Sequence, residues 1–214
     1  MTLRVIPGGD PVERVDLHRT ALARLSGDVS TMGPAITTLV PAGSTWPDYA
    51  DTVTPSWQPY WYRAVAWGAT DDDNGWRTSP GPASAAKAVL VPPATPPAVT
   101  AGSIVPASGA TPSYMTFTTD APPVVTSLGR FALRVAVTTQ DSTGTPGQAV
   151  LNTTLDAITP SSSVPPAGAD AAGPAWLAAD GSIGVVLNPA PGTHVAGVRI
   201  SVTDPRGRTT EVPP

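Results

Sequence analysis

The segment from Tyr60 to Trp67 constrains the fold of this chain more than any other. Its sequence, YWYRAVAW, is rich in the aromatic residues that are enriched in β-strands. Successive side chains of a strand point to opposite faces of a sheet. One face would carry Tyr60, Tyr62, Ala64 and Ala66, and the other would carry Trp61, Arg63, Val65 and Trp67. Large side chains on both faces predict a folded β-sheet protein with a defined register.

Alternating apolar and polar residues recur along the chain in runs of strand length. Pro, Gly, Ser and Thr separate these runs and supply turns. The predicted strands are residues 12–19, 35–40, 60–67, 85–91, 114–118, 130–137, 150–158, 183–187, 195–203 and 209–212. One helix-like patch covers residues 171–179, and Gly173-Pro174 limits it to a turn or two. We therefore expect an all-β fold made of two antiparallel β-sandwich domains in tandem.

A proline-rich segment marks the expected domain boundary. Residues 91–97 contain four prolines, which cannot supply a continuous ladder of N–H donors and favour an extended connector. We expect a first domain over residues 1–92, a linker over 93–98 and a second domain over 99–214. A low-complexity loop is expected within the second domain at 159–174, and loops of such length are usually functional or mobile.

Five segments of the first domain resemble the strands and corners of fibronectin type III domains. They are Glu13–Thr20, Trp46–Asp51, Pro55–Tyr60, Tyr62–Ala66 and Trp76–Pro80. The resemblance covers about 80 residues and implies that Tyr60 is the corner tyrosine, whose hydroxyl bonds to the backbone. The second half resembles such modules more loosely, through the strand at 195–203 and the turn residues that follow it.

The chain departs from this family at its beginning. The family needs two strands before the one at Val12, and residues 2–6 can supply only one of them. A sandwich that is short by a strand has an open edge, which another chain could complete by strand addition. Alternatively, the chain is a fragment, or the domain is a variant of the family.

Two interpretations apply to the aromatic residues of the Tyr60–Trp67 strand. In the first, the aromatic side chains only fill the core and the corner. In the second, Trp61, Arg63 and Trp67 form a binding surface, because exposed aromatic residues beside arginine are typical of interface hot spots. Trp76 is a further candidate for the same role.

The sequence lacks the residues that several kinds of chemistry would need. Cysteine is absent, which excludes disulfides and thiolate sites, and the two histidines have no metal-binding or nucleophile-elbow spacing. The acidic cluster at 71–75 fails the EF-hand pattern, and its residues are ordinary turn formers. A net charge of −4 without a basic patch argues against nucleic acid. We expect no enzymatic activity, cofactor, metal or membrane span.

Tandem modules with proline-rich connectors resemble those of minor tail and baseplate proteins of phages and phage-like injection particles. This resemblance implies a non-enzymatic structural or adhesive component, whose partners are other particle proteins or copies of itself. The N-terminal residues lack the apolar core of a signal peptide, which fits a particle that is produced in the bacterial cytoplasm. The alternatives are an accessory carbohydrate- or surface-binding module of a secreted bacterial protein, present as an extracellular fragment, and a cytoplasmic interaction domain.

Overall fold

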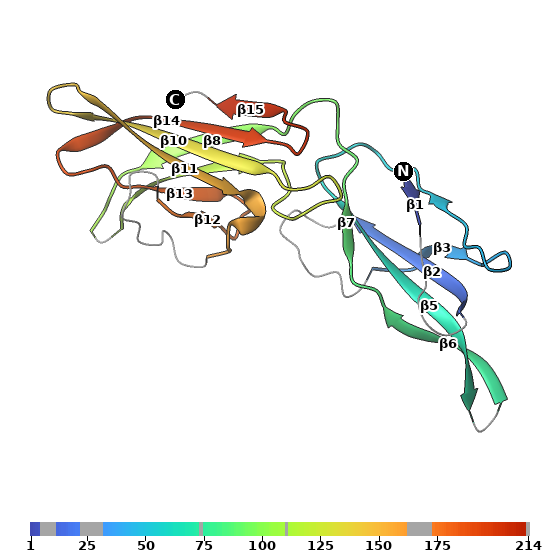
Figure 1. The fold of residues 1–214 in the computed structure, drawn as a ribbon. Helices are drawn as coiled ribbons and strands as arrows, with labels where there is room; N and C mark the ends of the chain where they lie inside the picture. Colours follow the sequence, from blue (N-terminus) through green and yellow to red (C-terminus); the bar gives the residue numbers. More distant parts are fainter. Residues whose placement is uncertain (5–11, 22–31, 73–74, 110, 162–172, 213–214) are drawn as a thin grey trace. The chain divides into compact units, whose positions relative to one another are not determined.

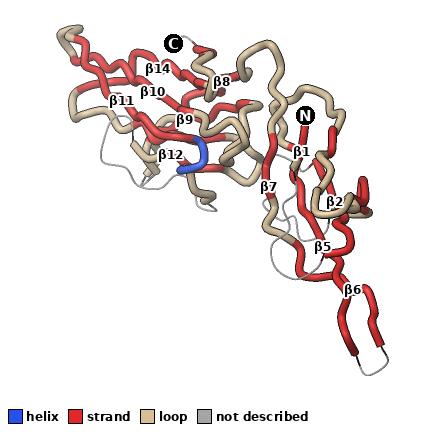
Figure 2. Tube along the Cα trace, turned by 45° about the vertical axis from the view of Figure 1, so that its right-hand side comes forward, coloured by secondary structure: helices blue, strands red, loops and turns tan. Residues whose placement is uncertain are grey.

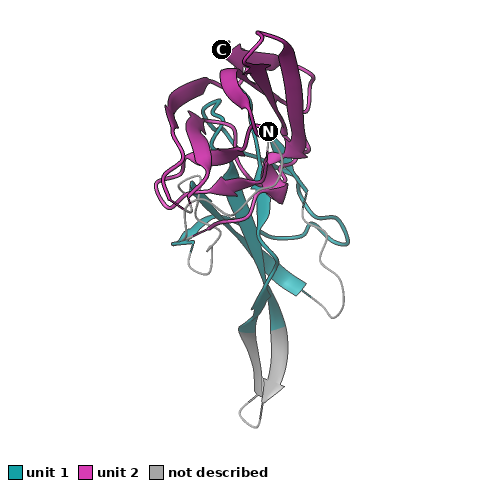
Figure 3. Cartoon of the chain, turned by 90° about the vertical axis from the view of Figure 1, so that its left-hand side faces the viewer, with its two compact units in different colours: residues 1–92 teal, residues 93–214 magenta. Residues whose placement is uncertain are grey.

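The fold is all-β and antiparallel, with 57% of the residues in strands, which confirms the prediction of an all-β antiparallel fold. The computed structural model describes all residues except 5–11, 22–31, 73–74, 110, 162–172 and 213–214. The chain forms two compact units, residues 1–92 and 93–214, which are coloured separately in Figure 3.

The first unit contains one large sheet and one small sheet (Figure 1). The large sheet has the order β3-β2-β5-β6, and β7 pairs with the first part of β5. The small sheet pairs β1 with β4. The strands are β1 (Thr2–Leu3), β2 (Val12–Ala21), β3 (Ala35–Leu39), β4 (Tyr49–Ala50), β5 (Tyr60–Asp72), β6 (Gly75–Ala83) and β7 (Lys87–Val89).

The core of the first unit lies between these two sheets. Leu17, Tyr62 and Val89 are buried on one face of the large sheet, and Leu3 of β1 and Tyr49 of β4 pack against them. Tyr62 belongs to this cluster, so the face of β5 that was predicted to carry Tyr62 is the face that points to the core. Leu3 and Tyr49 are also register partners in the small sheet, so the small sheet covers the core as a second layer.

The second unit is built from two four-stranded antiparallel sheets (Figures 1 and 2). One has the order β12-β13-β9-β8 and the other β11-β10-β14-β15. The strands are β8 (Val99–Val105), β9 (Ser113–Thr119), β10 (Ala132–Asp141), β11 (Pro146–Thr154), β12 (Ala175–Leu177), β13 (Ile183–Leu187), β14 (Thr193–Thr203) and β15 (Thr209–Val212). Buried residues from both sheets form the core, among them Phe117, Val135, Ile183 and Ile200.

The expected helical patch at residues 171–179 is wrong for the residues that the structure describes. Residues 175–177 form strand β12, which pairs with β13 through Trp176 opposite Gly184. Trp176 is only 1% exposed, and a Cβ atom added at Gly184 would lie 2.1 Å from its Cζ2 atom. Glycine thus lets the indole lie directly over the neighbouring strand. The strand expected at 150–158 begins and ends earlier, at Pro146–Thr154, and a single 3₁₀ turn follows at Leu155–Ala157.

The residues expected as a linker make hydrogen bonds within the second unit. Arg208 donates to the carbonyl oxygens of Pro93 and Ala94, and the Ala98 N–H donates to Asp120. The turn before Arg208 has the chemistry suggested by its sequence. Asp204 accepts two backbone N–H bonds there, and Gly207 adopts a φ of 81° that favours glycine.

Two turns of the second unit depend on carboxylates with a lowered pKa. Asp141 accepts bonds from the hydroxyl and N–H of Thr143 and from the N–H of Thr145, and these bonds lower its pKa below 3.8. The hydroxyl and N–H of Ser182 lower the pKa of Asp180 in the same way. The hydrogen bonds to Asp141 and Asp180 are therefore stronger when these carboxylates are ionised than when they are protonated.

We expect acid to weaken these two turns. A group with a lowered folded pKa contributes stability that is present above its unfolded pKa of 3.8 and is lost as the pH falls through the folded value. Urea unfolding at about pH 7 and about pH 3 should therefore show a lower midpoint in acid. The double variant Asp141→Asn/Asp180→Asn should show a smaller difference between the two pH values. An equal difference in the variant and the wild type would contradict this assignment.

Candidate interaction face of the first unit

Three of the four predicted site residues lie on one face of the large sheet. Strand β5 pairs with β2 so that Trp61 is opposite Thr20, Arg63 opposite His18, and Trp67 opposite Arg14. Cross-strand partners point to the same face of a sheet. We call this surface the tryptophan–arginine face; it consists of Trp61, Arg63 and Trp67 of β5 with Arg14, Asp16 and His18 of β2.

The tryptophan–arginine face lies on the side of the sheet opposite the core. Its six side chains are all half-buried, whereas Leu17 and Tyr62, which alternate with them, are buried. The structure leaves open the fourth predicted residue, Trp76. Its backbone pairs with Asp71 at the far end of β6, and its side chain lies outside the described residues.

One end of this face is held together by contacts between neighbouring strands. The Arg14 guanidinium carbon lies 4.2 Å from the centre of the Trp67 ring, a cation–π contact. Arg14 Nε is 4.0 Å from Asp16 Oδ1, which also accepts a 2.6 Å hydrogen bond from the Thr38 hydroxyl. These contacts connect β3, β2 and β5 at the end of the face where Trp67 lies.

The same face contains hydrogen-bond donors that find no acceptor among the described residues. The buried atoms are Arg14 Nε, Arg63 Nε and Trp67 Nε1. These atoms are themselves shielded from solvent, so a partner would contact the exposed parts of the same side chains rather than these nitrogens. Arg14, Arg63 and Asp16 give the face a net positive charge, whereas the whole chain carries −4. The face therefore suits a partner that presents carboxylates.

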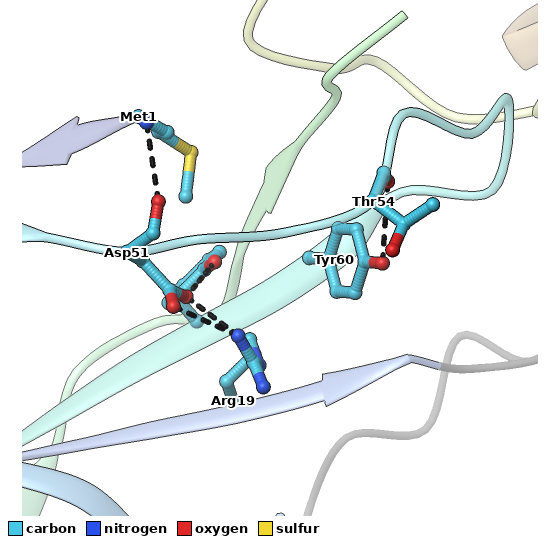
Figure 4. A network of polar contacts seen from close by, with 6 residues as sticks. Met1, Arg19, Asp51, Thr54 and Tyr60 are labelled. Carbon is cyan, nitrogen blue, oxygen red and sulfur yellow. Dashed lines mark hydrogen bonds and ion pairs between the residues drawn. The ribbon is translucent and has the colours of Figure 1, made fainter. Parts of the chain in front are cut away.

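On the inner side of the sheet, a polar network anchors the loop before β5 (Figure 4). Asp51 is 6% exposed and accepts two bonds from Arg19 Nη1, at 2.9 and 2.8 Å, and one from the Tyr62 hydroxyl at 2.6 Å. The bonds to Asp51 raise the pKa of Arg19. Burial, and then the bond to Asp51, raise the pKa of Tyr62. Both side chains thus keep their protons, and we assign the network to stability.

The structure supports Tyr60 as the corner tyrosine only in part. The Tyr60 hydroxyl donates to the carbonyl oxygen of Thr54 at 3.4 Å, a long hydrogen bond. Tyr62 makes the shorter bond and is the buried residue. Sequence reasoning did not identify Asp51 as the buried acceptor, although it lies at the end of the quoted Trp46–Asp51 motif. The feature of the sequence that could have identified Asp51 is its position shortly before a tyrosine-rich strand.

The positions of the two histidines and of the carboxylates bear on metal binding among the described residues. Within them, no three His, Asp or Glu side chains gather as a metal site would require. His18 Nδ1 lies 2.9 Å from the Gly33 carbonyl oxygen, and His194 is exposed on β14. Asp73 and Asn74 of the acidic cluster at 71–75 lie outside the described residues. No helix in the described part of the chain is long and apolar enough to cross a membrane.

Comparison with known proteins adds no relative. No protein-family model, curated protein or solved structure matches this chain.

Proposed function

We propose that this protein is a non-enzymatic structural or adhesive component of a phage tail or a phage-like particle, and that it binds protein partners through the tryptophan–arginine face. The observation that carries the proposal is the half-buried Trp61, Arg63 and Trp67 on one sheet face, where Arg14 stacks against Trp67. Tryptophan and arginine are the residue types most enriched in interface hot spots.

Two further features support an assembly role. The first unit resembles fibronectin type III modules, which occur in tail and baseplate proteins. The face carries positive charge on a chain with a net charge of −4, so it is complementary to acidic surfaces of other copies. A fold of this kind is a scaffold on which many functions occur, and the residues of the face, not the fold, determine what it binds.

A second candidate is a carbohydrate- or surface-binding module of a secreted bacterial protein. Half-exposed indole rings beside hydrogen-bond donors also suit the apolar faces and hydroxyl groups of sugars. In this case, the same residues would bind polysaccharide while the chain stays monomeric. The two candidates differ in the mass of the purified protein and in its ligand.

Trp61→Ala/Trp67→Ala should reduce self-association by at least about tenfold, because removing hot-spot residues typically costs 2 kcal/mol or more. Size-exclusion chromatography with light scattering measures this effect against a monomer mass of 21.7 kDa. Val40→Ala is the matched control, since Val40 is 60% exposed and lies outside the face. Wild type should exceed the monomer mass at high concentration, and the double variant should remain monomeric.

One result would favour the second candidate and contradict the proposal. It is a wild-type chain that is monomeric at every concentration and binds a bacterial polysaccharide, with binding lost in the double tryptophan variant. The genes beside the coding sequence provide a separate check, because tail-sheath or tape-measure genes would support the particle assignment.

A further inference from the structure

The outer edge of β11 presents unpaired main-chain groups. β11 ends its sheet, and among the described residues no strand pairs with it on the side away from β10 (Figure 1). At its two ends, Leu155 bonds to Phe131 and Thr145 to Asp141 through the main chain, in the register of the β10–β11 pair. Because bonding directions alternate along an antiparallel strand, odd-numbered residues of β11 bond to β10 and even-numbered residues point outward. Four of the even-numbered residues carry an N–H group: Gln148, Val150, Asn152 and Thr154.

The three other sheet edges of the second unit are shielded. β8 carries a bulge between Ala101 and Ile104 and lies beside β15 of the other sheet. β12 has only three residues, and the main chain of Leu177 bonds on its outer side to residues 159–161. β15 carries the exposed charge of Glu211. Bulges, short strands, covering segments and charged side chains all keep an edge from pairing with another chain.

β11 lacks these features in the part of the chain that the structure describes. It runs for nine residues and pairs with β10 in a register without a bulge. No charged residue occurs between Asp141 and Asp156. The one proline of the strand, Pro146, is its first residue, so the rest of the edge keeps its N–H groups. A long, regular and uncharged edge of this kind is a template for a further strand.

The side chains of β11 are also incompletely covered. Leu151 lies opposite Val135, and both point to the core side of the sheet. Val135 is 0% exposed, whereas Leu151 at the edge is only half-buried. On the other side of the sheet, Val150 is 39% exposed. A further strand would therefore bury apolar surface on both faces in addition to forming main-chain hydrogen bonds.

We propose that β11 pairs with β11 of a second copy of this chain, antiparallel and across a two-fold axis at Leu151. This two-fold register matches all four outward N–H groups with outward carbonyl groups of the other copy. The matched residues are Gln148 with Thr154 and Val150 with Asn152. Leu151 then faces Leu151 of the second copy and extends the core across the axis. Like charges would oppose each other in a symmetric contact of charged edges, and β11 carries no charge.

This contact lies in the second unit and does not depend on the tryptophan–arginine face. It uses one strand from each copy, fewer residues than the roughly 20–30 that each partner contributes to a standard interface. By itself it should be too weak to hold a dimer on a size-exclusion column, where Trp61→Ala/Trp67→Ala therefore remains monomeric. In an assembly formed through the tryptophan–arginine face, neighbouring copies raise the effective concentration of β11, and the strands pair.

Disulfide crosslinking of the full chain tests this register, because the chain has no cysteine of its own. Leu151→Cys places two thiols on the axis, where Cα atoms about 4.5 Å apart are within the range of a disulfide. Gln148→Cys is the matched control on the same strand, because its two thiols would lie roughly 20 Å apart. Under mild oxidation, Leu151→Cys should form covalent dimers at least about tenfold faster than Gln148→Cys. Random collision would favour the more exposed position 148, so equal rates or the reverse order would overturn the proposal.

Two further measurements check the pairing. Gln148→Cys mixed with Thr154→Cys should give mixed dimers faster than either variant gives dimers with itself, which mass spectrometry of the linked peptides measures. Val150→Pro in the Leu151→Cys chain removes an outward N–H, at a position where an edge strand accepts proline, and should slow crosslinking at least about tenfold. Circular dichroism checks that this variant is folded. A folded proline variant that crosslinks at an unchanged rate would overturn the proposal, as would a mixture that gives no excess of mixed dimers.

The double variant Trp61→Ala/Trp67→Ala separates this inference from the proposed function. Crosslinking should slow in this background, because the copies no longer assemble, but position 151 should still react faster than position 148. Absence of this preference in both backgrounds would overturn the β11 contact and leave the tryptophan–arginine face untouched. A preference for position 151 in chains whose mass does not depend on the two tryptophans would instead contradict the proposed function alone.

Discussion

Trp176→Ala is expected to destabilise the second unit by about 3–5 kcal/mol, the usual cost of truncating a large buried aromatic side chain. Trp176 is 1% exposed and is the largest of the fully buried side chains. It packs over Gly184 and contacts Tyr114, with ring centres 5.8 Å apart in an edge-on arrangement. Calorimetry should show a fall in the unfolding temperature on the order of 10 °C or more.

Two comparisons make this expectation specific. Val125→Ala removes an apolar side chain that is 52% exposed in the same unit, and it should change stability by less than about 0.5 kcal/mol. Gly184→Ala should destabilise the wild type, because the new Cβ would lie 2.1 Å from the indole, and should cost little when residue 176 is alanine. Additive effects of the two substitutions would contradict the packing described for this pair.

Asp51→Ala is expected to destabilise the first unit by about 3 kcal/mol. The substitution removes the acceptor of three side-chain hydrogen bonds and leaves the Arg19 charge and the Tyr62 hydroxyl without it. This free-energy cost lies at the low end of the range for breaking a buried ion pair, because the Arg19 side chain is 31% exposed and is partly screened by solvent. Urea unfolding monitored by fluorescence reports this unit, which holds five of the six tryptophans.

Asp48→Ala is the matched control for Asp51→Ala. Asp48 pairs with Arg4 on the surface of the same unit, and we expect its removal to leave the unfolding midpoint unchanged. Replacing Arg19 with methionine in the Asp51→Ala background should recover part of the lost stability, since no unpaired charge remains. Equal midpoints for Asp51→Ala and Asp48→Ala would show that the buried network does not stabilise the unit.

The strands of this protein could be predicted where alternation is strong. The limits predicted for β13 and β15 agree with the structure, and the segment from Tyr60 to Trp67 begins β5. Alternation is weak where the residues are small, and for that reason the alanine-rich segment around Trp176 was expected to be helical. Its strand conformation comes from pairing with β13 and from the glycine opposite the indole, which are contacts distant in sequence.

The candidate site could be predicted only in part, for a related reason. Period-two alternation in a single strand is enough to place Trp61, Arg63 and Trp67 on one face. The register that sets Arg14 against Trp67 depends on the pairing of β2 with β5, which the sequence does not encode locally.

Oxidative footprinting of tryptophan tests the central claim most directly, namely that this protein binds its protein partners through the tryptophan–arginine face. The free chain and the assembled protein would be oxidised under the same conditions and compared residue by residue. The account predicts that Trp61 and Trp67 react more slowly in the assembly, while Trp46, which is half-buried outside this face, reacts equally in both. Trp61 and Trp67 that remain as reactive in the assembly as in the free chain would contradict it.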